Sequence, residues 1–119
     1  MFTALTEPLL DDVQLSDLRD ALGDEDLQAM LSELPDAARE AIDRIRSAVE
    51  AGDADDARRA AHVLKGVASS FGAGRLAALA CELEHPTSLI ASIAEAVPVL
   101  DDLLVETSAA LALIGGAGA

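Results

Sequence analysis

The chain is almost devoid of aromatic residues: its 119 residues include no tryptophan, no tyrosine and only two phenylalanines. Residues that favour strands are scarce, whereas alanine and leucine, the best helix formers, dominate together with aspartate and glutamate. The composition therefore excludes a β-rich protein. It predicts an all-α domain whose core is built from small, closely packed side chains.

Cysteine is equally scarce, because Cys81 is the single one and cannot form an internal disulfide. Nothing in the sequence therefore indicates an oxidising compartment. Cys81 lies among alanines and leucines, and we expect it to be a small buried residue. No apolar run reaches the roughly 18 residues that cross a bilayer, and the N-terminus lacks the basic start of a secretory signal. We expect a cytoplasmic protein.

Positively charged residues are also few: the chain has eight lysines and arginines and 22 acidic residues, which gives a net charge of −14. So acidic a protein repels nucleic-acid phosphates and anionic lipid surfaces, which argues against both as partners. A hydrophobic fraction of 51% excludes a disordered chain. The length fits one compact domain, so we expect residues 1–119 to form a single domain.

Apolar spacing predicts helices in the first half of the chain. Residues 15–22 form a short amphipathic segment that stops at Gly23. From Asp24 to Val49, apolar residues recur every three or four positions, the spacing of one helix face. Pro35 lies inside this run and should kink it or separate its first turns.

The second half continues the pattern. A helix is expected over about residues 53–71, with Asp53 or Asp55 as its N-cap and acidic residues in its first turn. The sequence FGAG interrupts it, and a further helix follows over residues 75–84.

His85 and Pro86 mark the next break, after which Thr87 or Ser88 can cap a last long helix. Pro98 predicts a bend or an early break in that helix. Four amphipathic helices with short connections favour an antiparallel up-down four-helix bundle, with a short extra N-terminal helix. Its core covers about residues 15–114, and we expect the N-terminal lead-in and the glycine-rich tail to be flexible.

His62 shares one helix face with Lys65, Gly66 and Ser69, which follow it at three, four and seven positions. The apolar stripe of the same helix is offset from this face and consists of Ala61, Leu64, Ala68 and Phe71. The offset predicts that His62 points to solvent. The alternative is a histidine that packs in the core or caps a helix.

Gly66 is unexpected in a helix interior, where glycine costs about 1 kcal/mol relative to alanine. A bare backbone one turn from an exposed histidine would let the surface of another molecule come close. The alternative is that Gly66 relieves a helix crossing.

Local charge adds a third signal. Residues 57–81 contain no acidic residue but hold Arg58, Arg59, Lys65 and Arg75, half of the cations of the chain. A positive region in an acidic protein suits an anionic group or the acidic pocket of a partner.

These features coincide in the stretch AAHVLKGVASSFGAGRLAALACELE, which resembles the signature of histidine-containing phosphotransfer (HPt) domains. The matching positions are His62, Lys65, Gly66, Gly72, Leu76 and Glu84. The resemblance implies that His62 exchanges a phosphoryl group with an aspartate of response-regulator receiver domains, and that a sensor or hybrid histidine kinase supplies the relay. It also implies that Lys65 holds phosphoryl oxygens and that Gly66 gives clearance.

Around this centre, Arg58, Arg59, Ser69 and Arg75 are the expected surroundings of the phosphoryl group or the partner. We expect the Mg²⁺ that phosphoryl transfer uses to bind in the acidic pocket of the receiver, and we expect no cofactor of the chain's own. The chain lacks a glycine-rich nucleotide loop, so we expect a phosphocarrier and not a kinase. Four helices in one chain favour a monomer.

Three alternatives stay open at this point. The chain could be a helical adaptor that docks on receivers without being phosphorylated. It could form a bundle from two chains, like the dimerisation domain of sensor kinases. Glu82 and His85 form a Glu-x-x-His pair of the kind found in di-iron bundles, but the second such motif is missing, because Arg59 stands three residues before His62.

Overall fold

The computed structural model describes residues 2–115, and every regular element in that range is a helix. A 3₁₀-helix comes first and six α-helices follow: η1 (Thr3–Thr6), α1 (Asp12–Leu22), α2 (Asp24–Leu31), α3 (Leu34–Glu50), α4 (Ala54–Ser70), α5 (Gly74–Glu84) and α6 (Ile90–Gly115). The predicted all-α class is confirmed. Among these residues, no helix combines the length and apolarity that crossing a membrane requires.

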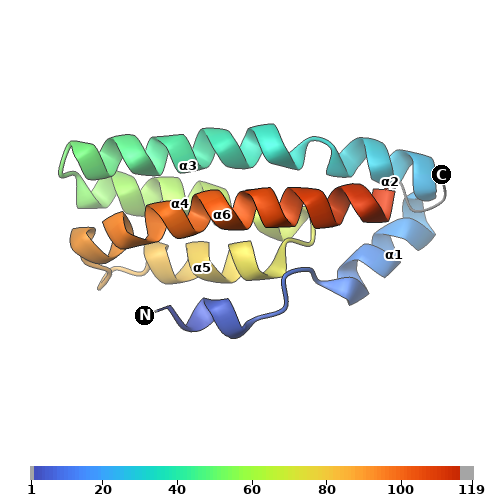
Figure 1. Ribbon diagram of the computed structural model, residues 1–119, viewed down its shortest axis with the longest axis horizontal. Helices are drawn as coiled ribbons and strands as arrows, with labels where there is room; N and C mark the ends of the chain where they lie inside the picture. The colour runs from blue at the N-terminus through green and yellow to red at the C-terminus, as the bar shows by residue number, and fades with distance from the viewer. Residues whose placement is uncertain (1, 116–119) are drawn as a thin grey trace.

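Helices α3 to α6 lie side by side along the long axis, and successive ones run in opposite directions (Figure 1). α4 packs between α3 and α5, while α6 contacts both α3 and α5. α1 and α2 lie at one end, where α2 covers the end of α6. The core is built from leucine, isoleucine and alanine, as the composition predicts, and includes Leu27, Ile42, Leu64, Leu79 and Leu100.

Pro35 separates α2 from α3, as predicted, because it occupies the first turn of α3, where its missing N–H has no helical partner to lose. Two α-helices and η1 therefore precede α3, where one short extra helix was expected. The predicted cap of α4 is confirmed at Asp53, whose side chain accepts a hydrogen bond from the Asp56 N–H at 3.0 Å.

α6 departs from two expectations. Neither Thr87 nor Ser88 begins it: the helix starts at Ile90, while the Ser88 hydroxyl donates to the Glu82 carbonyl at 2.6 Å. The helix also continues through Pro98 without an early break. Proline removes a single intrahelical hydrogen bond, and the buried side chains of Ile93 and Leu100 on either side hold the helix against the core.

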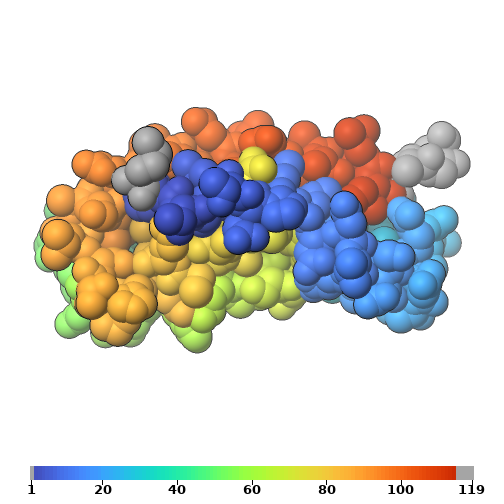
Figure 2. Space-filling view, turned by 90° about the horizontal axis from the view of Figure 1, so that it is seen from below, coloured from blue at the N-terminus to red at the C-terminus, as the bar shows by residue number. Residues whose placement is uncertain are grey.

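The N-terminal segment, residues 3–11, is packed along α5, where a loose lead-in was expected (Figure 2). Ala4 is buried, and the Asp11 N–H donates to the Gly72 carbonyl at 2.8 Å. The segment comes close at Gly74, where a Cβ atom would lie 3.1 Å from the Pro8 carbonyl oxygen. The C-terminal tail predicted to be flexible comprises residues 115–119. Gly115 is the last residue of α6, and residues 116–119 lie outside the described range.

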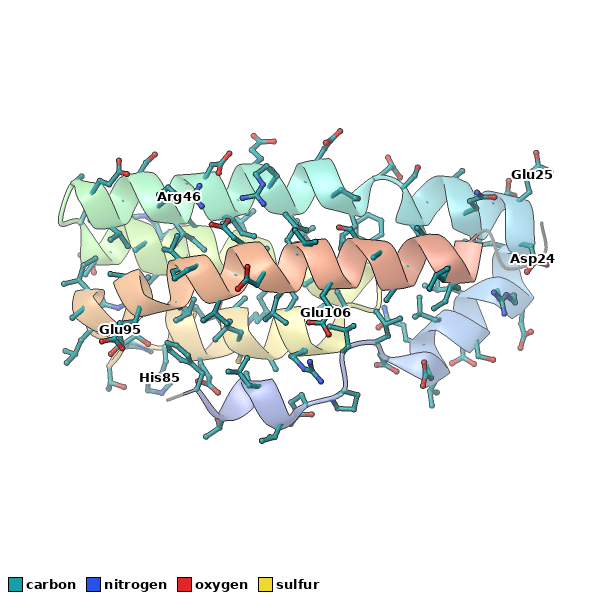
Figure 3. All side chains as sticks on the ribbon, in the orientation of Figure 1. Asp24, Glu25, Arg46, His85, Glu95 and Glu106 are labelled. Carbon is teal, nitrogen blue, oxygen red and sulfur yellow. The ribbon has the colours of Figure 1, made fainter. Side chains whose placement is uncertain are left out.

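A cluster of ion pairs joins α3 to α6. Figure 3 labels its Arg46 on α3. Asp101 accepts hydrogen bonds from Arg39 at 2.7 Å and from Arg46 at 2.6 Å. Partial burial raises the pKa of Asp101, but the two arginines outweigh it and leave that pKa below its ordinary value. The hydrogen bond to Asp101 also raises the pKa of Arg46.

We predict that Asp101→Asn lowers the free energy of unfolding at neutral pH by about 1 kcal/mol, a modest value because the pair is partly exposed. Since the folded-state pKa of Asp101 is lowered, its contribution is present at neutral pH and is lost as the pH falls through that pKa. Urea unfolding should therefore separate the two proteins at neutral pH but not at about pH 2. Asp102→Asn, at the exposed neighbouring position, is the control and should leave the free energy of unfolding unchanged at both pH values.

Candidate functional site

His62 lies in the middle of α4 and faces solvent, with 71% of its side chain exposed. The buried face of α4 carries Ala57, Ala61, Leu64 and Ala68 against the core, and this orientation turns His62 outward. The predicted exposure is confirmed, and the alternative of a core histidine is excluded.

Glu84, the last residue of α5, contacts both His62 and Lys65 of α4. One of its carboxylate oxygens, Oε2, lies 2.6 Å from Nδ1 of His62. The other, Oε1, accepts a hydrogen bond from the Lys65 ammonium. Only 19% of the Glu84 side chain is exposed, so a single, partly buried carboxylate holds both groups.

The charges of this triad follow from the contacts. The hydrogen bond to Glu84 raises the pKa of Lys65 and outweighs the opposing effect of burial. The hydrogen bond from Lys65 lowers the pKa of Glu84, and the bond from His62 adds to this effect. At neutral pH the site therefore contains a carboxylate and an ammonium.

An ionised carboxylate can only accept hydrogen bonds. Nδ1 of His62 must therefore carry the proton that Glu84 accepts. In the neutral ring, Nε2 is then the nitrogen with a free lone pair. The arrangement yields an exposed imidazole with a defined tautomer, a nitrogen nucleophile on its outer side and an ammonium within reach.

Gly66 is exposed, and a Cβ atom built on it would meet nothing within 4 Å. No neighbouring helix therefore requires glycine at this position, and the helix-crossing alternative is excluded. Beside it, Val63 is an exposed apolar side chain. The surface next to His62 is thus sterically open on the side of Gly66.

Arg58 and Arg59, one turn before His62, make contacts elsewhere. Arg58 pairs with Asp55 at 2.9 Å and donates to the Ser88 carbonyl at 2.7 Å, which ties α4 to the connection between α5 and α6. Arg59 is mostly exposed and lies 3.6 Å from Asp56.

Ser69 is exposed on the His62 side of α4, and its carbonyl accepts a hydrogen bond from Gln14 of α1. Arg75 is at the opposite end of α5 from Glu84. It donates from Nε to the Glu7 carbonyl at 2.8 Å and lies 4.0 Å from Glu106 of α6. Nine residues of helix, about 14 Å, separate it from Glu84.

The contact from Glu84 to His62 and Lys65 was not predicted, although the resemblance included Glu84. Antiparallel pairing of two helices across a short connection could have indicated it, because the end of α5 then lies beside the middle of α4. Cys81 is exposed, and the prediction of burial was wrong. The core side of α5 is taken by Leu76, Leu79, Ala80 and Leu83, and Cys81 lies one turn before Glu84 on the outer side.

The metal-binding alternative finds no support within residues 2–115, where no group of three or more histidine, cysteine, aspartate or glutamate side chains could hold an ion. The Glu82 carboxylate instead accepts hydrogen bonds from Thr3 and Ala4. His85 bonds to Thr87 through Nδ1.

Comparison with known proteins gave one match. A family model described as the Hpt domain matches residues 29–110, more than half of the chain. Searches of curated proteins and of solved structures returned no match. The matched range contains α3, α4 and α5 complete and therefore includes His62, Lys65 and Glu84. The chain belongs to the Hpt domain family.

Proposed function

We propose that the protein carries a phosphoryl group on Nε2 of His62 and exchanges it with the aspartate of receiver domains. Hpt domains are phosphocarrier modules of two-component phosphorelays, and the partners here would be response regulators and a sensor or hybrid histidine kinase. One observation supports this proposal most strongly: the imidazole of His62 is exposed while its Nδ1 is held by the Glu84 carboxylate.

In the forward step, the Nε2 lone pair attacks the phosphorus of the aspartyl phosphate in line with the leaving oxygen. An N–P bond forms, the P–O bond to the aspartate breaks, and the receiver regains a carboxylate. The ring then has positive charge, which Glu84 stabilises because Nδ1–H remains hydrogen-bonded to it. Transfer to a second receiver is the reverse reaction, so no proton has to leave Nδ1 in either direction.

Lys65 supplies the complementary charge. Its ammonium pairs with Glu84 on the same face of α4 as His62, and a flexible side chain can follow the phosphoryl oxygens as they approach. Phosphoryl transfer depends on positioning and charge stabilisation more than on covalent help. We place the Mg²⁺ that the reaction uses in the acidic pocket of the receiver.

The receiver would contact α4 over Gly66 and Val63, where the surface is open. Arg59 and Ser69, both exposed, would lie at the rim of this contact. Arg58 and Arg75 would act by holding the helices in place, because both already bind carbonyl groups of other segments.

We also infer that α3 to α6 act as an antiparallel up-down four-helix bundle in a monomer. The support is that all four helices come from one chain and bury a common core. A carrier of this kind needs no nucleotide site of its own.

We predict that His62→Gln abolishes labelling when the protein is incubated with receivers labelled on the aspartyl phosphate. The parent should acquire label that is labile in acid and stable in base, as a phosphoramidate is. His62 is exposed, so the variant should keep its helical content and its affinity for the receiver. Equal labelling of parent and variant would reject the assignment, and receiver binding without any labelling of the parent would favour the adaptor.

A second prediction concerns the open space beside Gly66, over which the receiver would dock. Because the space beside Gly66 is empty, Gly66→Leu should raise the helix stability by about 1 kcal/mol and yet slow transfer from a receiver roughly a hundredfold. Labelling by phosphoramidate, a small donor without a docking surface, should be unchanged. Ala109→Leu, at an exposed position of α6, should affect neither reaction. Unchanged transfer from the receiver in Gly66→Leu would contradict the docking of receivers over Gly66.

A further inference from the structure

Glu82 is attached to the N-terminal segment on the side of α5 that faces away from the site. Its Oε1 accepts hydrogen bonds from the Thr3 hydroxyl and from the Ala4 N–H, each at 2.5 Å. Two residues along a helix correspond to about 200° of rotation, so Glu82 and Glu84 project to opposite sides. Leu83 lies between them and is buried in the core.

The same segment is attached at the other end of α5. The Leu9 carbonyl accepts from the Arg75 N–H at 3.3 Å, and the Glu7 carbonyl accepts from Arg75 Nε at 2.8 Å. Residues 3–11 thus run along the whole of α5 and are bonded to its first and last turns (Figure 2).

The last turn of α5 needs such support because helix ends lack part of their backbone hydrogen bonding and fray readily. Glu84 is the final residue of this helix, and its carboxylate must stay within hydrogen-bond distance of two side chains on α4. Besides the bonds of Glu84 itself, this turn is held by buried Leu83, by the Ser88 hydroxyl on the Glu82 carbonyl, and by the Glu82 carboxylate on the N-terminal segment.

We propose that Glu82 is a positioning residue for the His62 site: by binding Thr3 and Ala4 it holds the last turn of α5 so that Glu84 stays bonded to Nδ1 of His62. The inference rests on the proposed phosphotransfer at His62 and extends it to a segment that precedes the matched Hpt range, which begins at residue 29. The N-terminal segment is then part of what keeps the histidine in its reactive tautomer.

The test compares Glu82→Ala and Thr3→Val with the parent. Thr3→Val replaces the hydroxyl with a methyl group of similar shape, so it remains informative if Glu82→Ala unfolds. The primary readout is the ¹⁵N chemical shifts of the His62 ring, which report whether Nδ1 or Nε2 carries the proton. The second is the rate of phosphoryl transfer from a labelled receiver, measured at a temperature where every variant is folded.

We expect both variants to shift population from the Nδ1–H to the Nε2–H tautomer, and Glu82→Ala to slow transfer roughly tenfold, as expected for a lost hydrogen bond to a charged group. Glu82→Gln, which keeps an acceptor oxygen, should retain most of the Nδ1–H tautomer population and most of the transfer rate. Asp101→Asn, which loosens the α3–α6 interface, is the control for general destabilisation and should leave the ring shifts unchanged.

In a Glu84→Ala background, Glu82→Ala should have no further effect on transfer, because its action passes through Glu84. Unchanged ring shifts in Glu82→Ala would overturn the proposal. A tenfold slower transfer caused by Glu82→Ala in the Glu84→Ala background would also overturn it. If no receiver labels the parent, the proposed phosphotransfer fails, and the tautomer measurement still decides the role of Glu82.

Discussion

The site depends on the hydrogen bonds of the Glu84 carboxylate, because they connect the end of α5 to both His62 and Lys65 of α4. Its position requires a tight α4–α5 connection, which Gly72 provides with a φ of 72°. A Cβ atom on Gly72 would lie 2.8 Å from Cγ of Leu15, so α1 packs directly on this turn. A turn far from the chemistry thereby determines where the carboxylate meets the imidazole.

Charge in this protein is distributed differently in space than along the chain. Residues 57–81 hold four cations without an acidic residue. Of these four, Lys65 is the one that pairs with Glu84, the residue to which His62 is hydrogen-bonded. Arg58 and Arg59 pair with the acidic first turn of their own helix, while Arg75 reaches the N-terminal segment and α6. The positive region inferred from the sequence is therefore reduced, beside the His62 ring, to the single ammonium of Lys65.

Features that depend on neighbouring residues could be predicted from the sequence. The exposure of His62, the Asp53 cap and the division at Pro35 follow from helix periodicity and backbone chemistry. Contacts between distant residues could not: His62 and Glu84 are 22 positions apart, and Thr3 and Glu82 are 79 apart. The packing of residues 3–11 has no periodic signal, since backbone carbonyls and N–H groups make most of its hydrogen bonds. Cys81 was misplaced because its apolar neighbours in sequence lie on the other side of α5.

The central claim is that Glu84 holds Nδ1 and leaves Nε2 of His62 to carry the phosphoryl group. Nuclear magnetic resonance of the phosphorylated, ¹⁵N-labelled protein tests it directly, because the one-bond coupling between phosphorus and nitrogen identifies the bonded atom. The account predicts a coupling to Nε2 of His62, with Nδ1 still protonated. A coupling to Nδ1, or phosphorus on any other residue, would contradict it.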